Sequence, residues 1–397
     1  MTEPLRILFY KRDLAWPFRS GHDVHTFNMM NALAAAGHRI GLVTGRPLPD
    51  PVRQSLECEF YATLEPDSGA EVAASGLPPL QERFRRFWGV SSAHLDSVRQ
   101  LTQRFHADAL VVSGLEVLPV LGAVPGPVRI WYAADEWVVH HLSQVHALDV
   151  RSWRGVWDGV LKGLYERAFR GAVDRAWAVT PVDAWAFRRI AGFPAADIVP
   201  NGVDADRYQP SSGPQEPFTA VFWGRLDFGP NIQALEWFCS RVWPLVQQRH
   251  SAARFTIIGF QPGEEVRRLS ALPGIELCAD LPDVRQVVHS RAVVVLPFTS
   301  GTGIKNKLLE AAAMGKAIVC TPTALTGLIS PPFAGLQDPQ VWADELSLLW
   351  SDDSERLRRG VDARDWVTRH HTWAAAAQRA SDGIVEALGA RKLPQRQ

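Results

Sequence analysis

The sequence predicts an α/β protein built from two doubly wound domains, each with a parallel sheet covered by helices. Apolar runs of strand length alternate with segments whose apolar residues recur at helical spacing. This alternation occurs once before and once after residues 211–217, Ser-Ser-Gly-Pro-Gln-Glu-Pro, whose composition is that of a linker. At 397 residues, the chain is also long enough for two domains of ordinary size.

The first half is expected to start with a strand at Leu5–Tyr10. A helix follows, because the apolar residues from Val24 to Ala34 recur at helical spacing, and Gly37 ends it. Further strands are expected at residues 40–44, 109–112, 128–132, 175–179 and 198–200. This β-α-β order predicts a parallel sheet that is buried on both faces.

The second half repeats the pattern. Its expected strands are residues 219–223, 254–258, 275–277, 292–296 and 317–320. Its expected helices are residues 232–248 and 304–314, followed by residues 343–350, 352–370 and 373–388.

The composition excludes several classes of protein. With 46% hydrophobic and 21% charged residues, the chain resembles a soluble globular protein. Its 42 basic residues equal its 42 acidic residues, which argues against nucleic acid as the main partner. The four cysteines have no metal-like or paired spacing, which suits a reducing cytoplasm. No apolar run approaches the roughly 18 residues of a spanning helix, and no signal peptide is apparent, so any expected membrane contact is peripheral.

A glycine loop that leads into a helix, Thr299–Lys316, is the most informative segment. Gly301 and Gly303 allow the backbone to approach a ligand closely, and the helix start offers unpaired N–H groups. Lys305 and Lys307 add positive charge, and the Glu310 carboxylate could accept hydrogen bonds from vicinal hydroxyls. These features predict a nucleotide-sugar pocket, with a simple helix-capping loop as the equally weighted alternative.

Two other phosphate loops do not fit this segment. A Walker loop ends in Gly-Lys-Ser/Thr, whereas Asn306 precedes Lys307 and Leu308 follows it. A dinucleotide fingerprint needs a third glycine at the position of Asn306.

A second motif, Gly224-Arg225-Leu226-Asp227, follows the first expected strand of the second domain. Ligands of open parallel sheets bind at the carboxyl ends of strands, which is where Arg225 falls. Its guanidinium is therefore predicted to bind phosphate in preference to forming a surface salt bridge.

Together these motifs resemble glycosyltransferase family 4 of the glycosyl transferases group 1 type. The resemblance rests on Pro200-Asn201-Gly202-Val203-Asp204, then Gly224-Arg225-Leu226, then Lys307-Leu-Leu-Glu310-Ala-Ala-Ala-Met-Gly315-Lys-Ala-Ile-Val319. Residues 224–231 and Asp283-Val-Arg285 are similar to the sugar transferase branch associated with exopolysaccharide and exosortase systems.

The resemblance implies a GT-B fold of two Rossmann-like domains facing a cleft. Residues 1–204 would form the acceptor-side domain, residues 205–373 the nucleotide-sugar domain, and a C-terminal helix in residues 374–397 would return to the first domain. The implied reaction is hexosyl transfer with retention from a UDP- or GDP-sugar, without a metal or cofactor. Arg225 and Lys307 would hold the diphosphate, and Glu310 the donor ribose.

The full set of residues implied at the donor is Gly21, Asn201, Gly224, Arg225, Ser300, Gly301, Thr302, Gly303, Ile304, Lys305, Lys307, Leu308 and Glu310. Two positions depart from the family pattern. Thr302 stands where many members have an acid against the sugar, and Asn231 replaces a second phosphate lysine. Lys305 is the candidate to compensate for Asn231.

The first domain is expected to supply the acceptor contacts. Asp135 lies in Trp131–Trp137, which ends an expected strand, and we predict that it contacts a donor sugar or an acceptor hydroxyl, with loop capping as the even alternative. With Arg225 and Lys307 it makes up the predicted catalytic set. His25 is a weaker candidate for an acceptor contact. A metal site at His22 and His25 is disfavoured because no third ligand accompanies them.

Two segments mix arginines with aromatic residues, Gln81–Trp88 and Arg151–Arg170. Such segments can lie at an anionic membrane interface. Aromatic side chains packed on the sheet, with the arginines in solvent, are the favoured interpretation.

The predicted function is therefore that of a cytoplasmic retaining glycosyltransferase of polysaccharide biosynthesis, with a peripheral location at the inner membrane face as an extension. Its acceptor would be a glycan or a lipid-linked intermediate. The alternatives are a nucleotide-sugar epimerase of the same fold and a catalytically idle binding or scaffold subunit, which Thr302 keeps open.

Overall fold

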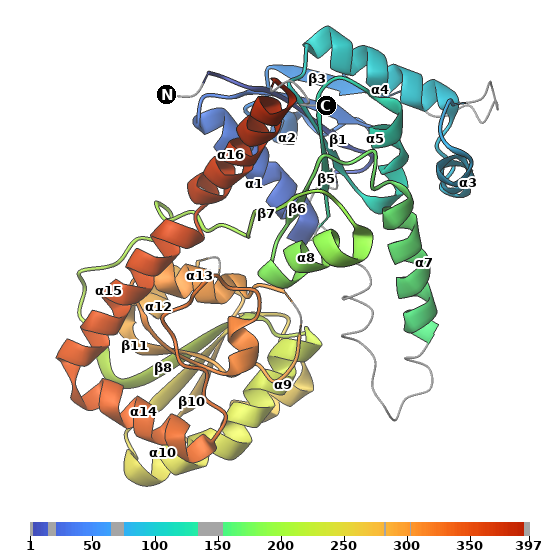
Figure 1. Cartoon of the computed structure of the whole chain (residues 1–397). Coiled ribbons are helices and arrows are strands. Elements are labelled where there is room, and N and C mark those ends of the chain that lie inside the picture. Colours follow the sequence, from blue (N-terminus) through green and yellow to red (C-terminus); the bar gives the residue numbers. More distant parts are fainter. Residues whose placement is uncertain are drawn as a thin grey trace. The chain divides into compact units, whose positions relative to one another are not determined.

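The computed structural model describes residues 3–14, 21–64, 75–133, 154–281, 283–301 and 303–392. The chain divides into two compact units (Figure 1). One consists of Met1–Pro200 with Trp373–Gln397, and the other of Asn201–Thr372. The divisions expected from the sequence fell after residues 204 and 373. Each unit contains a parallel sheet between helices, so the predicted α/β class is confirmed.

The first unit contains a seven-stranded parallel sheet in the order β3-β2-β1-β4-β5-β6-β7. Its strands are β1 (Arg6–Lys11), β2 (Arg39–Thr44), β3 (Phe60–Thr63), β4 (Ala109–Ser113), β5 (Val128–Tyr132), β6 (Arg175–Ala178) and β7 (Ala196–Ile198). Its helices are α1 (Gly21–Ala35), α2 (Asp50–Ser55), α3 (Pro79–Phe87), α4 (Ser92–Phe105), α5 (Pro119–Ala123), α7 (Arg154–Ala168), α8 (Pro181–Ala186) and α16 (Trp373–Lys392).

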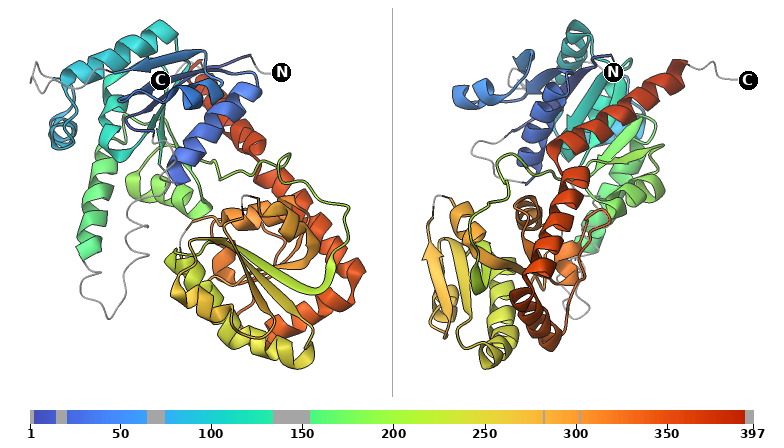
Figure 2. Two further views of the ribbon diagram at one scale, coloured as in Figure 1. Left: turned by 180° about the vertical axis from the view of Figure 1, so that it is seen from behind. Right: turned by 90° about the vertical axis from the view of Figure 1, so that its left-hand side faces the viewer.

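The last helix, α16, belongs to this first unit although it follows the whole second unit in sequence (Figure 2). Its buried face consists of small residues and one isoleucine, namely Ala376, Ala377, Ala380 and Ile384. They share a core cluster with Met29, Met30 and Leu33 of α1. The alanines allow α16 to lie close to α1, and α16 also contacts β5, β6 and β7 of the first sheet.

The second unit contains a five-stranded parallel sheet in the order β10-β9-β8-β11-β12. Its strands are β8 (Glu216–Arg225), β9 (Arg254–Phe260), β10 (Ile275–Ala279), β11 (Arg291–Leu296) and β12 (Ala317–Cys320). Its helices are α9 (Gly229–Trp237), α10 (Trp243–Arg249), α11 (Glu264–Leu269), α12 (Arg285–Ser290), α13 (Asn306–Ala313), α14 (Pro339–Ser351) and α15 (Asp353–His370).

Hydrogen bonds to main-chain carbonyls explain why the segment before the expected linker belongs to the second unit. The Val203 N–H donates to the carbonyl of His371 at 2.7 Å. Arg285 donates to the Arg207 carbonyl at 2.7 Å, and Arg364 to the Tyr208 carbonyl at 3.2 Å. Two arginines on separate helices therefore hold this stretch against the second unit.

Two strands and one helix depart from the expectation. The edge strand β3 was not predicted, because its four residues are only partly buried and do not form a long apolar run. The expected strand at residues 198–200 is Ala196–Ile198 instead. The single helix expected at residues 232–248 is α9, a π-helical turn at Phe238–Val242 and α10, since Pro244 in the first turn of α10 has no N–H to donate.

Among the described residues, no helix is long and apolar enough to cross a membrane.

Candidate functional site

The predicted glycine loop lies between β11 and α13. Gly301 and Gly303 have φ angles of 100° and 75°, a region that favours glycine. This backbone leads into α13, whose N-cap residue is Lys305, and no side chain of the described residues caps this helix. The Leu308 N–H donates to the Lys305 carbonyl at 2.8 Å, which leaves the N–H groups of Asn306 and Lys307 for a ligand at the positive end of the helix dipole.

A cavity of about 490 Å³ lies beside this helix start, within the second unit. It combines aromatic, small and charged side chains. Its lining residues are Trp223, Gly224, Phe228, Pro230, Asn231, Phe298, Gly301, Ile304, Lys305, Asn306, Lys307 and Glu310. The structure thus brings six of the predicted donor residues together: Gly224, Gly301, Ile304, Lys305, Lys307 and Glu310.

The two lysines share one wall of the cavity. The Lys305 Nζ donates to the carbonyls of Gly301 at 2.8 Å and Gly303 at 3.1 Å, while the Lys307 Nζ donates to Asn231 Oδ1 at 3.4 Å. Both ammonium groups lie over the Phe298 ring, 5.6 and 5.7 Å from its centroid. Burial, assisted by the Lys307 charge, lowers the pKa of Lys305 to about 8, and burial also lowers the pKa of Lys307.

Glu310 lies one turn along α13 from the lysines. The Trp223 Nε1–H donates to its Oε2 at 2.9 Å, which fixes the carboxylate against the end of β8. Burial raises the pKa of Glu310, and the Trp223 bond and the Lys307 charge oppose that shift. Since a carboxylate can accept about four hydrogen bonds, Glu310 keeps acceptor capacity for the hydroxyls of a sugar.

Asn231 explains how the Gly224–Arg225 turn is held. Its Nδ2 donates to the Arg225 carbonyl at 2.7 Å, and its side chain is buried. A Cβ at Gly224 would overlap Cε of Lys307, so only glycine lets that lysine approach the end of β8. The position where a lysine was expected therefore holds the turn, and Lys305 supplies the second positive charge in the cavity.

Arg225 ends β8, as predicted, but its guanidinium points away from the cavity. Its guanidinium pairs with Asp227, with Nη2 2.7 Å from Oδ2, and its side chain is 71% exposed. It is not among the residues that line the cavity. The surface salt bridge, the less favoured interpretation of the sequence, is what the structure contains, because Asp227 is close enough in sequence to bind the same guanidinium.

The remaining predicted donor residues of the second unit that the structure describes do not line the cavity. Ser300 Oγ donates to Gln233 at 2.5 Å, and Asn201 Nδ2 donates to Asn306 Oδ1 at 3.1 Å. Leu308 is fully buried in the core, so its side chain packs rather than facing a ligand. Thr302 lies outside the described residues.

In the first unit, a polar cluster that the sequence did not reveal lies at the carboxyl ends of β1 and β4. The Lys11 Nζ is 3.2 Å from Asp23 and 3.4 Å from His22 Nδ1. His22 Nε2 is 3.0 Å from the Ser113 hydroxyl. Burial and the Lys11 charge lower the pKa of His22 well below its usual value, so the ring is neutral. Since the Lys11 ammonium can only donate to Nδ1, the ring proton is on Nε2 and is donated to the Ser113 oxygen. No short motif contains these residues, since they come from separate strands and a helix.

His25, predicted to contact the acceptor, is almost fully buried at 1% exposure. Its Nε2 donates to the carbonyls of Val199 and Pro200 at 3.1 and 3.3 Å, and its ring packs on Tyr132 and Trp373. Burial lowers its pKa to about 4. These contacts give His25 a structural role at the start of α1 in place of an acceptor contact.

Two further residues of the first unit were predicted at the site, Gly21 and Asp135. Gly21 is the first residue of α1. Asp135 lies outside the described residues. In the described parts of the chain, no group of three or more His, Cys, Asp or Glu side chains is arranged to hold a metal ion.

Residues 217–352 match the family model described as glycosyl transferases group 1. A comparison with curated proteins finds no match. Among solved structures, a glycosyltransferase from Rickettsia africae aligns with a TM-score of 0.63 at 11% identity, covering 98% of this chain and 99% of that one. Sucrose-phosphate synthase from Thermosynechococcus elongatus aligns with a TM-score of 0.63 at 16% identity, covering 97% and 100%.

HepE from Anabaena, solved with UDP, aligns with a TM-score of 0.61 at 13% identity and covers 96% and 100%. At these identities the structural matches establish the fold, and the family model describes the second unit, which holds the cavity. The chain therefore has the GT-B fold, and residues 217–352 of its second unit match the glycosyl transferases group 1 model.

Proposed function

We propose that this protein is a retaining, metal-independent hexosyltransferase that moves a sugar from a UDP- or GDP-sugar to a hydroxyl of a glycan or a lipid-linked glycan intermediate. The observation that carries the proposal is that Lys305, Lys307 and Glu310 line one cavity at the uncapped start of α13. Cations and N–H donors suit a diphosphate, and a fixed carboxylate suits vicinal hydroxyls.

The charges of the cavity support a role in holding the leaving group. When the glycosidic C–O bond to the diphosphate breaks, the electron pair stays on the phosphate oxygen. Two ammonium groups in a half-buried cavity would stabilise that charge much more than they would in water. This is the neutralisation that divalent cations provide in other phosphoryl sites, here assigned to the side chains of Lys305 and Lys307.

The stereochemistry that we propose is retention of the anomeric configuration. The acceptor hydroxyl attacks the anomeric carbon on the face that the diphosphate leaves, and its proton passes to the departing phosphate oxygen. No protein nucleophile takes part in this front-face displacement, so the anomeric configuration is retained. The work of the protein is alignment and charge stabilisation.

The acceptor is assigned to the first unit. The Lys11–His22–Ser113 cluster lies at the carboxyl ends of β1 and β4, the edge where open α/β sheets bind ligands. Asp135 remains our candidate for a sugar or acceptor contact, and its test is mutational.

The test is a screen followed by a transfer assay. Thermal stability is measured with UDP-, GDP- and ADP-sugars, since a ligand that binds the native state raises its melting temperature. UDP-sugars come first, because HepE, which has a similar fold, was solved with UDP and with UDP-glucose. The stabilising donor is then incubated with glycan and lipid-linked acceptors, and the anomeric configuration of the product is read by NMR.

The outcomes separate the proposal from its rivals. A product whose mass increases by one hexose, with retained configuration, supports it. Conversion of the donor sugar without any acceptor would identify an epimerase. Donor binding without hydrolysis or transfer would identify an idle binding subunit. Inversion at the anomeric carbon would contradict the front-face mechanism while leaving sugar transfer intact.

A further inference from the structure

Helix α7 exposes apolar side chains on the face where a surface helix normally carries polar ones. Trp157, Val160, Leu161 and Leu164 are spaced as one stripe of a helix, and all four are exposed, with Trp157 at 72% and Leu161 at 57%. Other residues of the same helix, Gly159, Gly163 and Tyr165, are buried. The stripe is therefore additional to the face that packs on the first unit.

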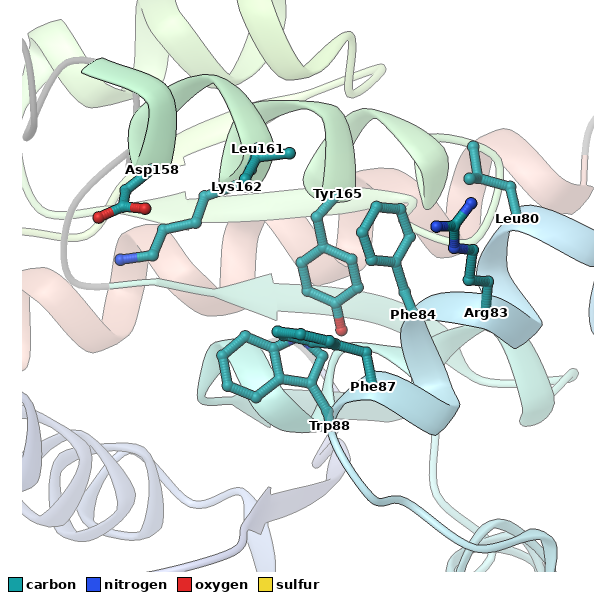
Figure 3. A pocket seen from close by; sticks show the side chains of 9 residues that line it. All are labelled: Leu80, Arg83, Phe84, Phe87, Trp88, Asp158, Leu161, Lys162 and Tyr165. Atoms are coloured by element: carbon teal, nitrogen blue, oxygen red, sulfur yellow. The ribbon is translucent and has the colours of Figure 1, made fainter. Parts of the chain in front are cut away.

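Helix α3 continues this apolar surface. It contacts α7, and a groove of about 490 Å³ lies between the two helices. Figure 3 shows the rings of Phe84, Phe87, Trp88 and Tyr165 gathered in it. Phe87 is 77% exposed and packs edge-on against Trp88 at 5.3 Å. We call the exposed residues of the two helices, Leu80, Phe87, Trp157, Val160, Leu161 and Leu164, the α3–α7 face.

Basic side chains border this face. Arg83 and Lys162 lie on either side of the rings in Figure 3, and Asp158, beside Lys162, is the acid of the groove lining. Helix α3 carries three arginines but a single acid, Glu82, which Arg85 and Arg86 share at 2.6 and 2.9 Å. Arg83 forms no ion pair within the described residues. Since the whole chain has equal numbers of basic and acidic residues, this positive excess is local.

We propose that the α3–α7 face docks on the surface of an anionic lipid bilayer. The apolar side chains would enter the boundary between headgroups and acyl chains, and Arg83 and Lys162 would lie at the level of the lipid phosphates. Exposed Trp, Phe and Leu bordered by Arg and Lys are the pattern that binds such interfaces. The proposal does not depend on which sugar or donor the second unit binds.

Charge complementarity favours a bilayer over a second copy of this chain. In a symmetric dimer through this face, the arginines of one copy would approach those of the other, which costs free energy. The acids that balance this local excess lie elsewhere on the chain, outside a symmetric interface through this face. An anionic membrane surface offers apolar and negatively charged groups together.

The experiment is co-sedimentation of the full chain with vesicles of 30% phosphatidylglycerol in phosphatidylcholine, compared with pure phosphatidylcholine. Leu161→Ser tests the apolar contribution. Leu357→Ser, on α15 of the second unit, is its matched control, because Leu357 is 58% exposed against 57% for Leu161. Arg83→Gln tests the charge. Its control is Arg241→Gln, an exposed arginine that also makes no ion pair within the described residues.

We expect the unmodified protein to bind the anionic vesicles more tightly than the neutral ones. Leu161→Ser should weaken partitioning about tenfold, and Arg83→Gln about fivefold, an effect that disappears at high salt. Both controls should bind as the unmodified chain does. If Leu161→Ser fails to fold, as judged by circular dichroism, Trp157→Ser replaces it.

Two results would overturn the proposal. One is equal binding by Leu161→Ser and Leu357→Ser. The other is a concentration-dependent dimer in the absence of lipid that Leu161→Ser dissociates in sedimentation velocity, which would make this face an interface between copies. Donor binding should be unchanged in every variant, so failure here is distinguishable from failure of the proposed transfer.

Discussion

Lys307→Met removes the more enclosed of the two charges in the cavity while preserving the length of the side chain. The Lys307 Nζ lies 3.4 Å from Asn231 Oδ1 and over the rings of Phe222 and Phe298, at 5.8 and 5.7 Å. A methionine can occupy this apolar part of the site. The expected loss is therefore mainly the interaction of the ammonium group with a bound diphosphate.

The size of that loss follows from Coulomb's law. Two unit charges about 4 Å apart interact by about 4 kcal/mol at the effective dielectric of about 20 that suits partly buried groups. Lys305 and water would recover part of this, so we expect a net loss of about 2 to 3 kcal/mol, or roughly 30- to 150-fold in affinity for the diphosphate. The pKa of Glu310 should also rise further, because Lys307 is one of the groups that hold it down.

The assay is calorimetric titration with the nucleoside diphosphate that stabilises the protein most, together with the corresponding nucleoside. Loss of the Lys307 charge should weaken the diphosphate and leave the nucleoside unchanged. Lys162→Met, in the first unit, is the control for removal of a lysine and should bind both ligands normally. A change of less than about threefold for the diphosphate, or equal losses for the two ligands, would refute the assignment of Lys307 to phosphate.

Three further predictions concern charged groups of the second unit. Because the pKa of Lys305 is about 8, diphosphate affinity should fall as the pH rises from 7 to 9, and Lys305→Arg, which stays charged, should flatten that profile in the same titration. Asp227→Asn should free Arg225 from its salt bridge and tighten diphosphate binding severalfold. Arg225→Ala should reduce the rate of sugar transfer. Near-normal turnover of that variant would exclude Arg225 from catalysis. Burial lowers the pKa of Lys316 to about 7, so between pH 7 and its ordinary pKa the unfolded chain binds more protons. Lys316 alone should then make the free energy of unfolding about 2 kcal/mol higher at pH 9 than at pH 7, and Lys316→Met should reduce the difference measured by urea unfolding by that amount.

Much of the fold is visible in the sequence because buried parallel strands leave short apolar runs. The runs expected at residues 254–258, 292–296 and 317–320 fall within β9, β11 and β12. The edge strand β3 has no such run because only part of its surface is buried. The π-helical turn at Phe238–Val242 depends on a backbone hydrogen-bond pattern that the residue types do not predict.

The part of the candidate site that comes from a single segment of the chain could be predicted from the sequence. Lys305, Lys307 and Glu310 are close in sequence and begin one helix, so local structure alone brings them to one cavity. Arg225 was not predictable, since its position depends on which of several rotamers its guanidinium adopts and Asp227 is within reach. The Lys11–His22–Ser113 cluster depends on the pairing of β1 with β4, which brings together residues about a hundred positions apart.

The two buried lysines should make the second unit more stable with a diphosphate bound than without it. Burial lowers the pKa of both Lys305 and Lys307, which means that each charge costs free energy in the empty cavity. A diphosphate would reverse that cost by pairing with both charges, and it would raise both pKa values. Diphosphate binding between pH 8 and pH 9 should therefore take up protons, because about half of Lys305 is neutral at pH 8 without the ligand, and most of it at pH 9. Calorimetric enthalpies that differ between buffers of different ionisation enthalpy would reveal this uptake. Enthalpies that do not depend on the buffer would show that the diphosphate binds away from Lys305.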